Sequence, residues 1–560
     1  MDRKMAGIIS LMLAAFTFIL TYGSLYRNGQ VTNSIDSSDL TYVERFFDED
    51  TVIDIYVTLS ESDYEDMMQN PTQEEYKQAD VIVDGETMEN VGFRVKGNSS
   101  LNMVASSDSD RFSFKLDFDQ YISEQNLAGL TKLNLNNSVS DPSYMREYLS
   151  YWLLGEMGVP TPAYCYANVY VNGELVGLYL AVEGIEEPFL ERTYGSSAGA
   201  LYKPEGQGSD LVYIDDNIES YSGIELVTDS KNGDDTELVA MIKALNEGSD
   251  LDSYLDIDEI LRYFAVNTVL VNMDSYQGNF KHNYYLYEED GVFSILPWDF
   301  NMSFGGFSMG GTGGELTSLY IDSPLSGTTL AERPLIGKLL EVEEYKELYH
   351  RYLEEFINGP FTVENMNKEI EHVANMIRPY LEQDPTKFYS MEQFEQALTE
   401  GSATVVGETG PQSTGTMGGQ RAGDNKMMDG NAIGLGKFVR ERISNVSQQL
   451  SGELPAVGDT AAALGMQPGN FADPQQGDRP AGQMPQGEIQ LPAKMNRENP
   501  PDINMKSPPD INGQNLPKNG IIGAKLQQTS SQTLYMIGGS LLALLVTLII
   551  IFKKKTKYQL

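Results

Sequence analysis

The sequence reads NMDSYQGNFKHNYYLY over residues 272–287 and PWDFN over residues 297–301, and this stretch decides which fold we expect. Between the two pieces, Tyr284–Tyr287 and Val292–Leu296 are short apolar runs separated by turn residues, which predicts a β-hairpin. Carboxylate and amide side chains therefore precede the hairpin, and a second carboxylate follows it. The order of these parts is more informative than any one residue, because Asp-x-x-x-x-Asn alone is a weak signal.

The spacing of these polar residues fits metal-assisted phosphoryl transfer. Such a site uses one carboxylate to orient or deprotonate the acceptor hydroxyl, an amide oxygen four or five residues later to help hold a divalent ion, and a second carboxylate that joins the ion to the nucleotide phosphates. Asp274, Asn279 and Asp299 follow this order. Asn283, directly before the hairpin, is a rival for the amide ligand, and the sequence does not separate the two. For Asp274 the alternative is an ordinary helix-end or turn carboxylate.

The glycine-rich run after the motif and the histidine within it can each be interpreted as structural or as functional. The glycine-rich run Phe304–Gly314 stands where kinases keep an activation segment, and a plain flexible loop is its alternative. His282 is interpreted as structural or orienting rather than as a general base. His350 and His372, the other two histidines, lie in helical segments, so the sequence contains no histidine cluster that would bind a metal.

The first half offers a turn that could bind phosphate. Val91–Ser100 places a strand before a small polar turn formed by Gly97, Asn98 and Ser99. Backbone N–H groups of such a turn can approach phosphates closely, because Gly97 adds no side chain. An ordinary hairpin loop is the alternative.

A lysine and a glutamate complete the expected nucleotide-binding groups. Arg111–Phe118 alternates strictly between polar and apolar residues, which predicts a strand of an antiparallel sheet with one covered face. Lys115 lies on its polar face and could pair with phosphates, with a solvated lysine as the alternative. Glu147, on a helix predicted over Ser143–Met157, is the candidate partner of Lys115.

The remaining patterns predict an α+β fold in two lobes, mostly β in the first half and mostly α in the second. The expected strands are Thr51–Ser60, Asp80–Val83, Glu86–Lys96 and a hairpin over Ala167–Val182 that turns at Asn172-Gly173. The expected helical segments of the second half are Ile257–Asp274, Pro334–Asn358, Val363–Glu382 and Lys437–Leu450.

Composition narrows the function. The net charge of −42 at pH 7, with no basic stripe outside the termini, argues against a nucleic-acid partner. The single cysteine, Cys165, excludes an intramolecular disulfide and a thiolate-rich metal site. Its apolar neighbours predict a buried packing residue.

The 560 residues predict one large domain with appended segments. We assign the domain to residues 49–453, after a polar stalk at 27–48 and with an insertion at 401–432 that is expected to be disordered. Residues 454–530 are rich in Pro, Gly, Gln and Asn, a composition that is typical of a disordered linker.

Both ends of the chain are hydrophobic. Residues 1–26 have the layout of a signal peptide or an N-terminal membrane anchor, and an uncleaved anchor is favoured. Residues 534–552 carry no charge and, at about 1.5 Å per residue, are long enough to cross a hydrocarbon core of about 30 Å. The basic tail at 553–560 marks the cytoplasmic side, so the main domain is expected to be extracytoplasmic.

Taken together, the motifs resemble the spore coat protein H (CotH) kinase family, an atypical protein-kinase-like group. The resemblance covers roughly residues 50–450. It rests on eight motifs in the family's order: Phe93–Ser100, Ser113–Phe118, Tyr170–Glu174, Gly177–Tyr179, Glu183–Ile185, Leu201–Lys203, Asp274–Tyr287 and Pro297–Gly305.

The resemblance implies a kinase-like fold, use of ATP with Mg²⁺ or Mn²⁺, and transfer of phosphate to Ser or Thr of surface or coat proteins. It also implies that Asp274 and Asp299 are the essential carboxylates. The family commonly has Asp where this chain has Asn301, a difference that bears on metal occupancy. Because some relatives act as adhesion or structural proteins, a non-catalytic surface-binding or scaffold protein with the same fold is the alternative.

Overall fold

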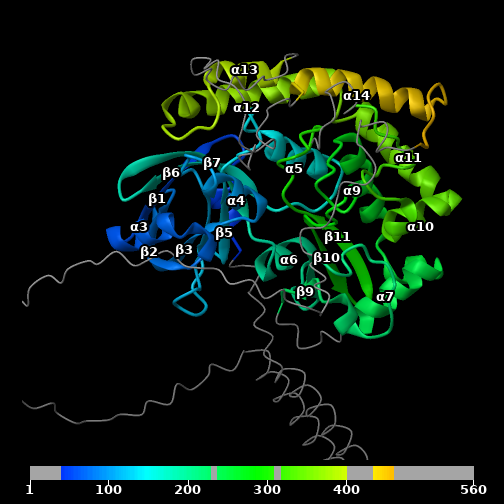
Figure 1. Ribbon diagram of the computed structural model, residues 1–560, viewed down its shortest axis with the longest axis horizontal. Helices are drawn as coiled ribbons and strands as arrows, with labels where there is room; N and C mark the ends of the chain where they lie inside the picture. The colour runs from blue at the N-terminus through cyan, green and yellow to red at the C-terminus, as the bar shows by residue number, and fades with distance from the viewer. Residues whose placement is uncertain (1–39, 229–235, 308–316, 400–432, 459–560) are drawn as a thin grey trace, which may run out of the picture. The chain divides into compact units, whose positions relative to one another are not determined.

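The computed structural model describes residues 40–228, 236–307, 317–399 and 433–458 (Figure 1). Within these ranges, no helix combines the length and the apolar character needed to cross a membrane. The predicted membrane segments at 1–26 and 534–552, the basic tail, the insertion at 401–432 and the linker beyond residue 458 lie outside the described residues and stay predictions.

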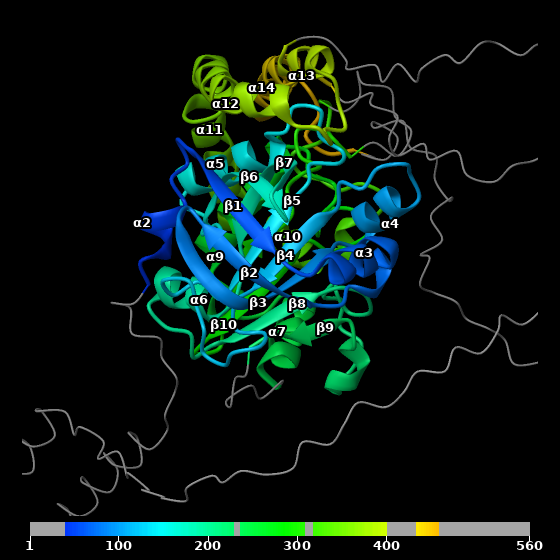
Figure 2. The ribbon, with the colours of Figure 1, turned by 90° about the vertical axis from the view of Figure 1, so that its left-hand side faces the viewer.

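Seven strands of the first half form a closed β-barrel, which lies on the side nearest the viewer in Figure 2. The strands are β1 (Val52–Thr58), β2 (Lys77–Val83), β3 (Glu86–Lys96), β4 (Ser113–Asp117), β5 (Lys132–Asn136), β6 (Tyr164–Val171) and β7 (Glu174–Glu183). Their order is β1-β2-β3-β4-β5-β7-β6, and a parallel pairing of β1 with β6 closes the barrel. All other neighbours are antiparallel.

The barrel interior is apolar because alternate residues of each strand point inward. Phe93 on β3 and Phe114 on β4 meet there with ring centroids 5.0 Å apart. Cys165 is fully buried in the same cluster and its thiol donates to the carbonyl of Phe46 (3.2 Å), which confirms its predicted packing role. The predicted hairpin is confirmed too: Asn172 and Gly173 both have positive φ (51° and 85°), as a type I′ turn requires.

The polar face of β4 is also covered, which corrects the expectation of a sheet with one covered face. Ser113 and Asp117 are buried, and the Ser113 hydroxyl accepts a hydrogen bond from the Asn137 N–H (3.1 Å). Arg111, just before the strand, is fully buried and pairs with Asp384 (2.7 Å). Partners from distant segments allow these polar groups to be buried. The alternation of one strand does not reveal such partners.

The rest of the described chain is mainly helical, with one four-stranded sheet of order β11-β10-β8-β9. Its strands are β8 (Ala200–Pro204), β9 (Ile224–Leu226), β10 (Tyr284–Glu289) and β11 (Val292–Pro297). The helices of the first half are α2 (Tyr42–Phe46), α3 (Glu61–Gln69), α4 (Ser99–Ala105), α5 (Arg146–Glu156), α6 (Glu187–Tyr194), α7 (Thr236–Glu247), α8 (Leu251–Tyr254) and α9 (Ile257–Val269). Those that follow are α10 (Pro334–Glu341), α11 (Glu343–Asn358), α12 (Val363–Gln383), α13 (Met391–Leu398) and α14 (Leu435–Leu450). The predicted α+β class, with β in the first half and helices in the second, is confirmed.

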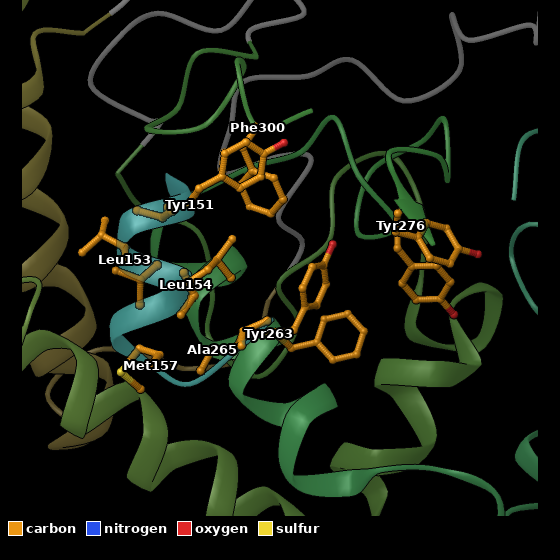
Figure 3. Packing of buried hydrophobic residues seen from close by; sticks show 14 of the residues in the cluster. Tyr151, Leu153, Leu154, Met157, Tyr263, Ala265, Tyr276 and Phe300 are labelled. Atoms are coloured by element: carbon orange, nitrogen blue, oxygen red, sulfur yellow. The ribbon is translucent and has the colours of Figure 1, made fainter. Parts of the chain in front are cut away.

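Helices α5 and α9 pack together in the larger core cluster, and the Phe300 side chain packs against a residue of each helix (Figure 3). The Phe300 ring centroid lies 6.1 Å from that of Tyr151 on α5 and 6.4 Å from that of Tyr263 on α9. All three side chains are buried. Removing such aromatic surface from water contributes about 25 cal/mol per Å². The core therefore anchors the residue that follows Asp299.

The folded part is slightly longer than the domain assigned from the sequence. Helix α2 lies in the segment assigned to the stalk, yet Tyr42 and Phe46 are buried in the barrel cluster. At the other end, the carbonyl of Ala456 accepts a hydrogen bond from the Asp322 N–H (2.9 Å). The folded part therefore begins at or before Tyr42 and continues past residue 453.

One predicted helix ends early, and this places Asp274 in a loop. Helix α9 ends at Val269 instead of continuing to Asp274. The buried amide of Asn267 donates to the carbonyl of Asn272 (3.2 Å), and Val271 has a left-handed backbone (φ 49°). Together these divert the chain from the helix axis. The predicted segment at 334–358 is likewise two helices, α10 and α11, with extended backbone at Val342 between them.

Candidate active site

Asp274 lies in the loop between α9 and β10, and two side chains fix its carboxylate. His282 Nε2 lies 2.7 Å from Oδ1 of Asp274. The Asn283 amide donates to the carbonyl oxygen of Asp274 (2.8 Å) and to its Oδ2 (3.2 Å). The Asp274 side chain is 17% exposed. It is thus oriented by the protein but still open to solvent on one side.

The structure brings Asn283, and not Asn279, into contact with Asp274. Asn283 has a left-handed backbone (φ 58°), which asparagine tolerates better than most residues. Asn279 lies beside Gly327, and its carbonyl faces the guanidinium of Arg333. Of the two amides left open by the sequence, Asn283 is therefore the one placed to act with Asp274.

A buried polar network holds the loop that carries Asp274. Asn267 donates to Oε1 of Gln277 (2.6 Å), and Gln277 donates to the Thr268 hydroxyl (3.0 Å) and the Pro324 carbonyl (2.7 Å). Arg333 donates to the Tyr276 carbonyl (2.8 Å). All four side chains that donate or accept within this network are almost completely buried. Satisfied networks of this kind fix one loop conformation.

Asp299 follows β11 in a left-handed conformation (φ 54°) that is unfavourable for a residue with a side chain. Its backbone N–H donates to the hydroxyl of Tyr151 (3.2 Å). The next residue, Phe300, is anchored in the core as described above. The turn after the hairpin is therefore held on both sides, as expected for a metal-binding carboxylate.

Glu147 on α5 faces β3 and β5 of the barrel. It accepts two hydrogen bonds from the amide of Asn136 (2.9 and 3.1 Å) and one from the hydroxyl of Tyr151 (3.1 Å). Asn136 in turn accepts a hydrogen bond from Lys96 Nζ (2.8 Å), which lies 5.6 Å from the centroid of the Trp298 ring. A continuous chain of contacts thus links β3, β5, α5 and the turn at Asp299.

Three charges in this region, buried Glu147 and half-buried Lys96 and Asp299, influence one another. Burial raises the pKa of Glu147 to about 7; the charge of Asp299 adds to this, and the hydrogen bond from Asn136 and the charge of Lys96 oppose it. Burial also raises the pKa of Asp299, opposed by Lys96 and assisted by Asp274. The pKa of Lys96 is lowered by burial, against the effect of Asp299 and Glu147. Such perturbed clusters are typical of functional sites.

His282 joins the same electrostatic cluster. Burial disfavours the imidazolium, but the hydrogen bond to Asp274 and its charge, together with Asp299 and Glu205, outweigh that effect and raise the pKa of His282. A protonated His282 donates to Asp274 and holds its carboxylate in place. This contact agrees with the orienting role inferred from the sequence.

The Lys115–Glu147 pair expected from the sequence does not form. Lys96 is instead the lysine whose charge acts on Glu147, and Asn136 hydrogen-bonds to both. In the register of β3 with β4, Lys115 lies opposite Arg94, and Lys96 lies opposite Ser113. The two lysines share one face of the sheet but are offset by two residues, or about 6.6 Å. The offset carries Lys115 away from α5.

Lys115 lies further along the same face, among charges of both signs. Burial lowers its pKa to about 8; Glu186 opposes this effect, and Lys132 and Arg94 add to it. Lys132 is paired with Glu186 (2.6 Å), whereas Lys115 has no ion pair with any described residue. A bound anion such as phosphate would stabilise this charge.

The turn at Gly97 requires glycine. Gly97 has φ 124°, and a Cβ there would lie 2.7 Å from the Ser100 hydroxyl oxygen. Asn98 and Ser99 are exposed at the start of α4. The turn directly follows Lys96 and so lies at the edge of the cluster, but its role in phosphate binding stays a prediction.

The oxygen donors fit a hard divalent cation. Within the described residues, no group of three or more His, Cys, Asp or Glu side chains could hold a metal ion. Mg²⁺ in nucleotide-dependent enzymes commonly takes one or two protein carboxylates and completes its shell with phosphate oxygens and water. Asp299 offers such a carboxylate, and the side-chain oxygen of Asn283 offers an additional amide donor. The raised pKa of Asp299 also means that a nearby cation would stabilise its charged form.

Sequence reasoning does not single out Lys96 or Tyr151. The strand pattern could have indicated Lys96 as a site residue. Phe93 and Val95 point into the barrel, so the alternation places Lys96 on the outer face, next to Gly97. Tyr151 carries no such signal, since a buried tyrosine on an apolar helix face is indistinguishable in the sequence from a core residue.

Comparisons with known proteins identify the family of this chain. The CotH kinase protein family model matches residues 93–404, more than half of the chain. The chain is 29% identical over 279 residues to inner spore coat protein H of Bacillus subtilis (strain 168), covering 48% of this chain and 74% of that protein. It is 25% identical over 246 residues to an inner spore coat protein H-like protein of the same organism, covering 44% and 67%. The matched region contains Lys96, Glu147, Asp274 and Asp299, and the chain belongs to the CotH kinase protein family.

Proposed function

We propose that this chain is a protein kinase that transfers phosphate from ATP to a Ser or Thr hydroxyl of a surface or coat protein. In this proposal the barrel and the helical part are the two lobes of a kinase-like fold. The supporting observation is that Lys96, Glu147, Asp274 and Asp299, from four separate segments, interact electrostatically at one place.

Each residue has a step in the proposed reaction. Asp274 accepts the proton of the acceptor hydroxyl, whose oxygen forms a bond to the γ-phosphorus as the bond to the β–γ bridging oxygen breaks and ADP leaves. His282 and Asn283 keep the Asp274 carboxylate in position. Lys96 and Lys115 neutralise phosphate charge. Asp299, with Asn283, would hold Mg²⁺ or Mn²⁺, which supplies further charge neutralisation when bound.

We further propose that the domain is membrane-anchored and extracytoplasmic. The hydrophobic segments within 1–26 and at 534–552 support anchoring, and the basic tail supports the orientation. The names of both relatives refer to inner spore coat protein H, which supports a surface or coat protein as acceptor.

The test is transfer of radiolabel from [γ-³²P]ATP with Mn²⁺ by the purified full-length protein in detergent. Label should appear on the protein itself or on myelin basic protein as a general Ser/Thr acceptor. Asp299→Asn should abolish labelling, and Asp252→Asn, at an exposed position of α8, should not change it.

Failure of the wild type to label either acceptor would contradict the kinase proposal. Thermal unfolding with ATP and Mn²⁺ then separates the alternatives. A stabilised protein is a nucleotide binder, whereas an unchanged melting temperature supports the non-catalytic scaffold.

A further inference from the structure

The hydroxyl of Tyr151 lies between two groups of the candidate site. It accepts a hydrogen bond from the Asp299 N–H (3.2 Å) and donates one to Oε1 of Glu147 (3.1 Å). Tyr151 is fully buried, one helical turn after Glu147 on α5. A hydroxyl has one donor and can accept, so both capacities are used within the site.

The backbone of Asp299 needs this contact. Its left-handed conformation is one that residues with side chains avoid, and such conformations persist only where the surroundings hold them. A buried N–H without a partner would also be unfavourable. The Tyr151 hydroxyl meets both needs, because it satisfies the N–H and holds the backbone from which the Asp299 side chain projects.

The Tyr151 ring is fixed independently of its hydroxyl. Its centroid lies 5.6 Å from that of Tyr164 and 6.1 Å from that of Phe300. Figure 3 shows Tyr151 directed from α5 toward Phe300. Phenylalanine would preserve this packing and remove only the hydroxyl, so the contribution of the two hydrogen bonds can be measured alone.

We propose that Tyr151 is a positioning residue that holds Asp299 ready for a divalent cation and ties it to Glu147 on α5. The proposal rests on the kinase function proposed above. Tyr151 need not touch nucleotide or acceptor. Removing partners that orient a metal-binding side chain commonly weakens metal binding by about 10- to 100-fold.

The first test compares Tyr151→Phe with the wild type in Mn²⁺ titrations of the full-length protein, with free Mn²⁺ followed by electron paramagnetic resonance and AMP-PNP as the nucleotide. We expect Mn²⁺ affinity to fall by about 10-fold or more. Tyr148→Phe is the matched control, because Tyr148 is buried on the same helix and donates to the Glu49 carbonyl (3.2 Å). Its Mn²⁺ affinity should stay within about 2-fold of the wild type, since no site residue loses a partner.

The second test follows hydrogen exchange of the backbone amides at 298–304 by mass spectrometry, without metal or nucleotide. In the wild type the Asp299 amide should exchange slowly. Tyr151→Phe should accelerate exchange there, and Tyr148→Phe should not. A fast Asp299 amide in the wild type would overturn the proposal even if Tyr151→Phe failed to fold.

The outcomes separate the two proposals. Wild-type Mn²⁺ binding that Tyr151→Phe leaves unchanged overturns the positioning role alone. A wild type that binds no Mn²⁺ with AMP-PNP overturns the kinase function and the metal role of Tyr151 together. Equal effects of Tyr151→Phe and Tyr148→Phe assign both tyrosines to general packing and also overturn the proposal.

Discussion

At the scale of single residues, Glu147 and Asp299 are held where burial favours their neutral forms. A carboxyl group kept in such surroundings reduces the stability of the folded protein at neutral pH. Functional sites retain such groups because a substrate or a cation compensates for them. The same residues should therefore be harmful to stability and necessary for activity.

Asp299→Asn should separate stability from activity. The substitution removes a charge that partial burial disfavours, so the metal-free protein should melt at the same temperature as the wild type or higher. If the proposed function holds, phosphate transfer should fall by about 100-fold or more, because the proposed metal ligand is lost. Differential scanning fluorimetry and the radiolabel assay measure the two effects. A lower melting temperature with retained transfer would contradict the assignment.

Lys96 and Lys115 should differ in their effects on the reaction. Lys96→Met removes the positive charge that acts most strongly on Asp299 and Glu147, and we expect kcat to fall by about 100-fold. Lys115→Met, offset along the sheet, should mainly raise the KM for ATP, by about 10-fold. Initial rates at varied ATP separate kcat from KM. The reverse pattern would restore the role that the sequence assigned to Lys115.

At the scale of elements, helix α5 is joined to the segment after Asp299 by buried side chains. Arg146 donates to the carbonyls of Ser303 (2.9 Å) and Phe304 (3.0 Å), and to that of Ile433 before α14 (3.0 Å). The hydroxyls of Ser150 and Ser303 lie 2.7 Å apart. The helix that carries Glu147 and the segment after Asp299 are therefore linked directly by buried hydrogen bonds.

Arg146→Lys should destabilise the fold. Lysine lacks the planar set of donors that satisfies three carbonyls at once, and it would leave buried oxygens unpaired. We expect a loss of about 3 kcal/mol in the free energy of unfolding. Urea denaturation measures this loss. Arg378→Lys is the control, because its pair with Glu395 is exposed and should change stability by less than about 0.5 kcal/mol.

At the scale of the whole molecule, the net negative charge and the carboxyl groups with raised pKa values both lower the stability of the folded state as pH rises. The net charge is already −42 at pH 7, and like charges repel more strongly as pH rises. Glu259 on α9 is a half-buried carboxyl: burial raises its pKa to about 8, assisted by Asp256 and opposed by a hydrogen bond from Tyr194. The folded state therefore keeps protons that the unfolded chain has released.

The melting temperature should be highest near pH 5 and should fall toward pH 8. A folded-state pKa raised above the unfolded value makes the folded protein bind more protons in this window, so stability decreases as pH rises. Glu259→Gln should flatten the profile, because glutamine stays neutral throughout. Below about pH 4 the sign reverses, since the lowered pKa of Asp322 contributes stability that is lost on protonation. Scanning fluorimetry from pH 3.5 to 9 checks both limbs, and a rise between pH 5 and 8 would contradict the prediction.

The sequence by itself determined the α+β class, the β-hairpins and most helices, because alternation of period two and apolar spacing of three and four residues are local properties. It also placed Asp274 and Asp299 in the order of a phosphoryl-transfer site, since short segments set their spacing. The sequence did not predict where α9 ends, because a buried side-chain network, and not helix propensity, diverts the chain there.

Only the tertiary structure decided which polar groups meet. The register of β3 with β4 selects Lys96 over Lys115 as the lysine whose charge acts on Glu147. The fold of the loop selects Asn283 over Asn279. The hydrogen bond from Asp299 to Tyr151 joins residues 148 positions apart. Such contacts depend on barrel closure and on the packing of distant elements, which the local pattern of a single chain does not encode.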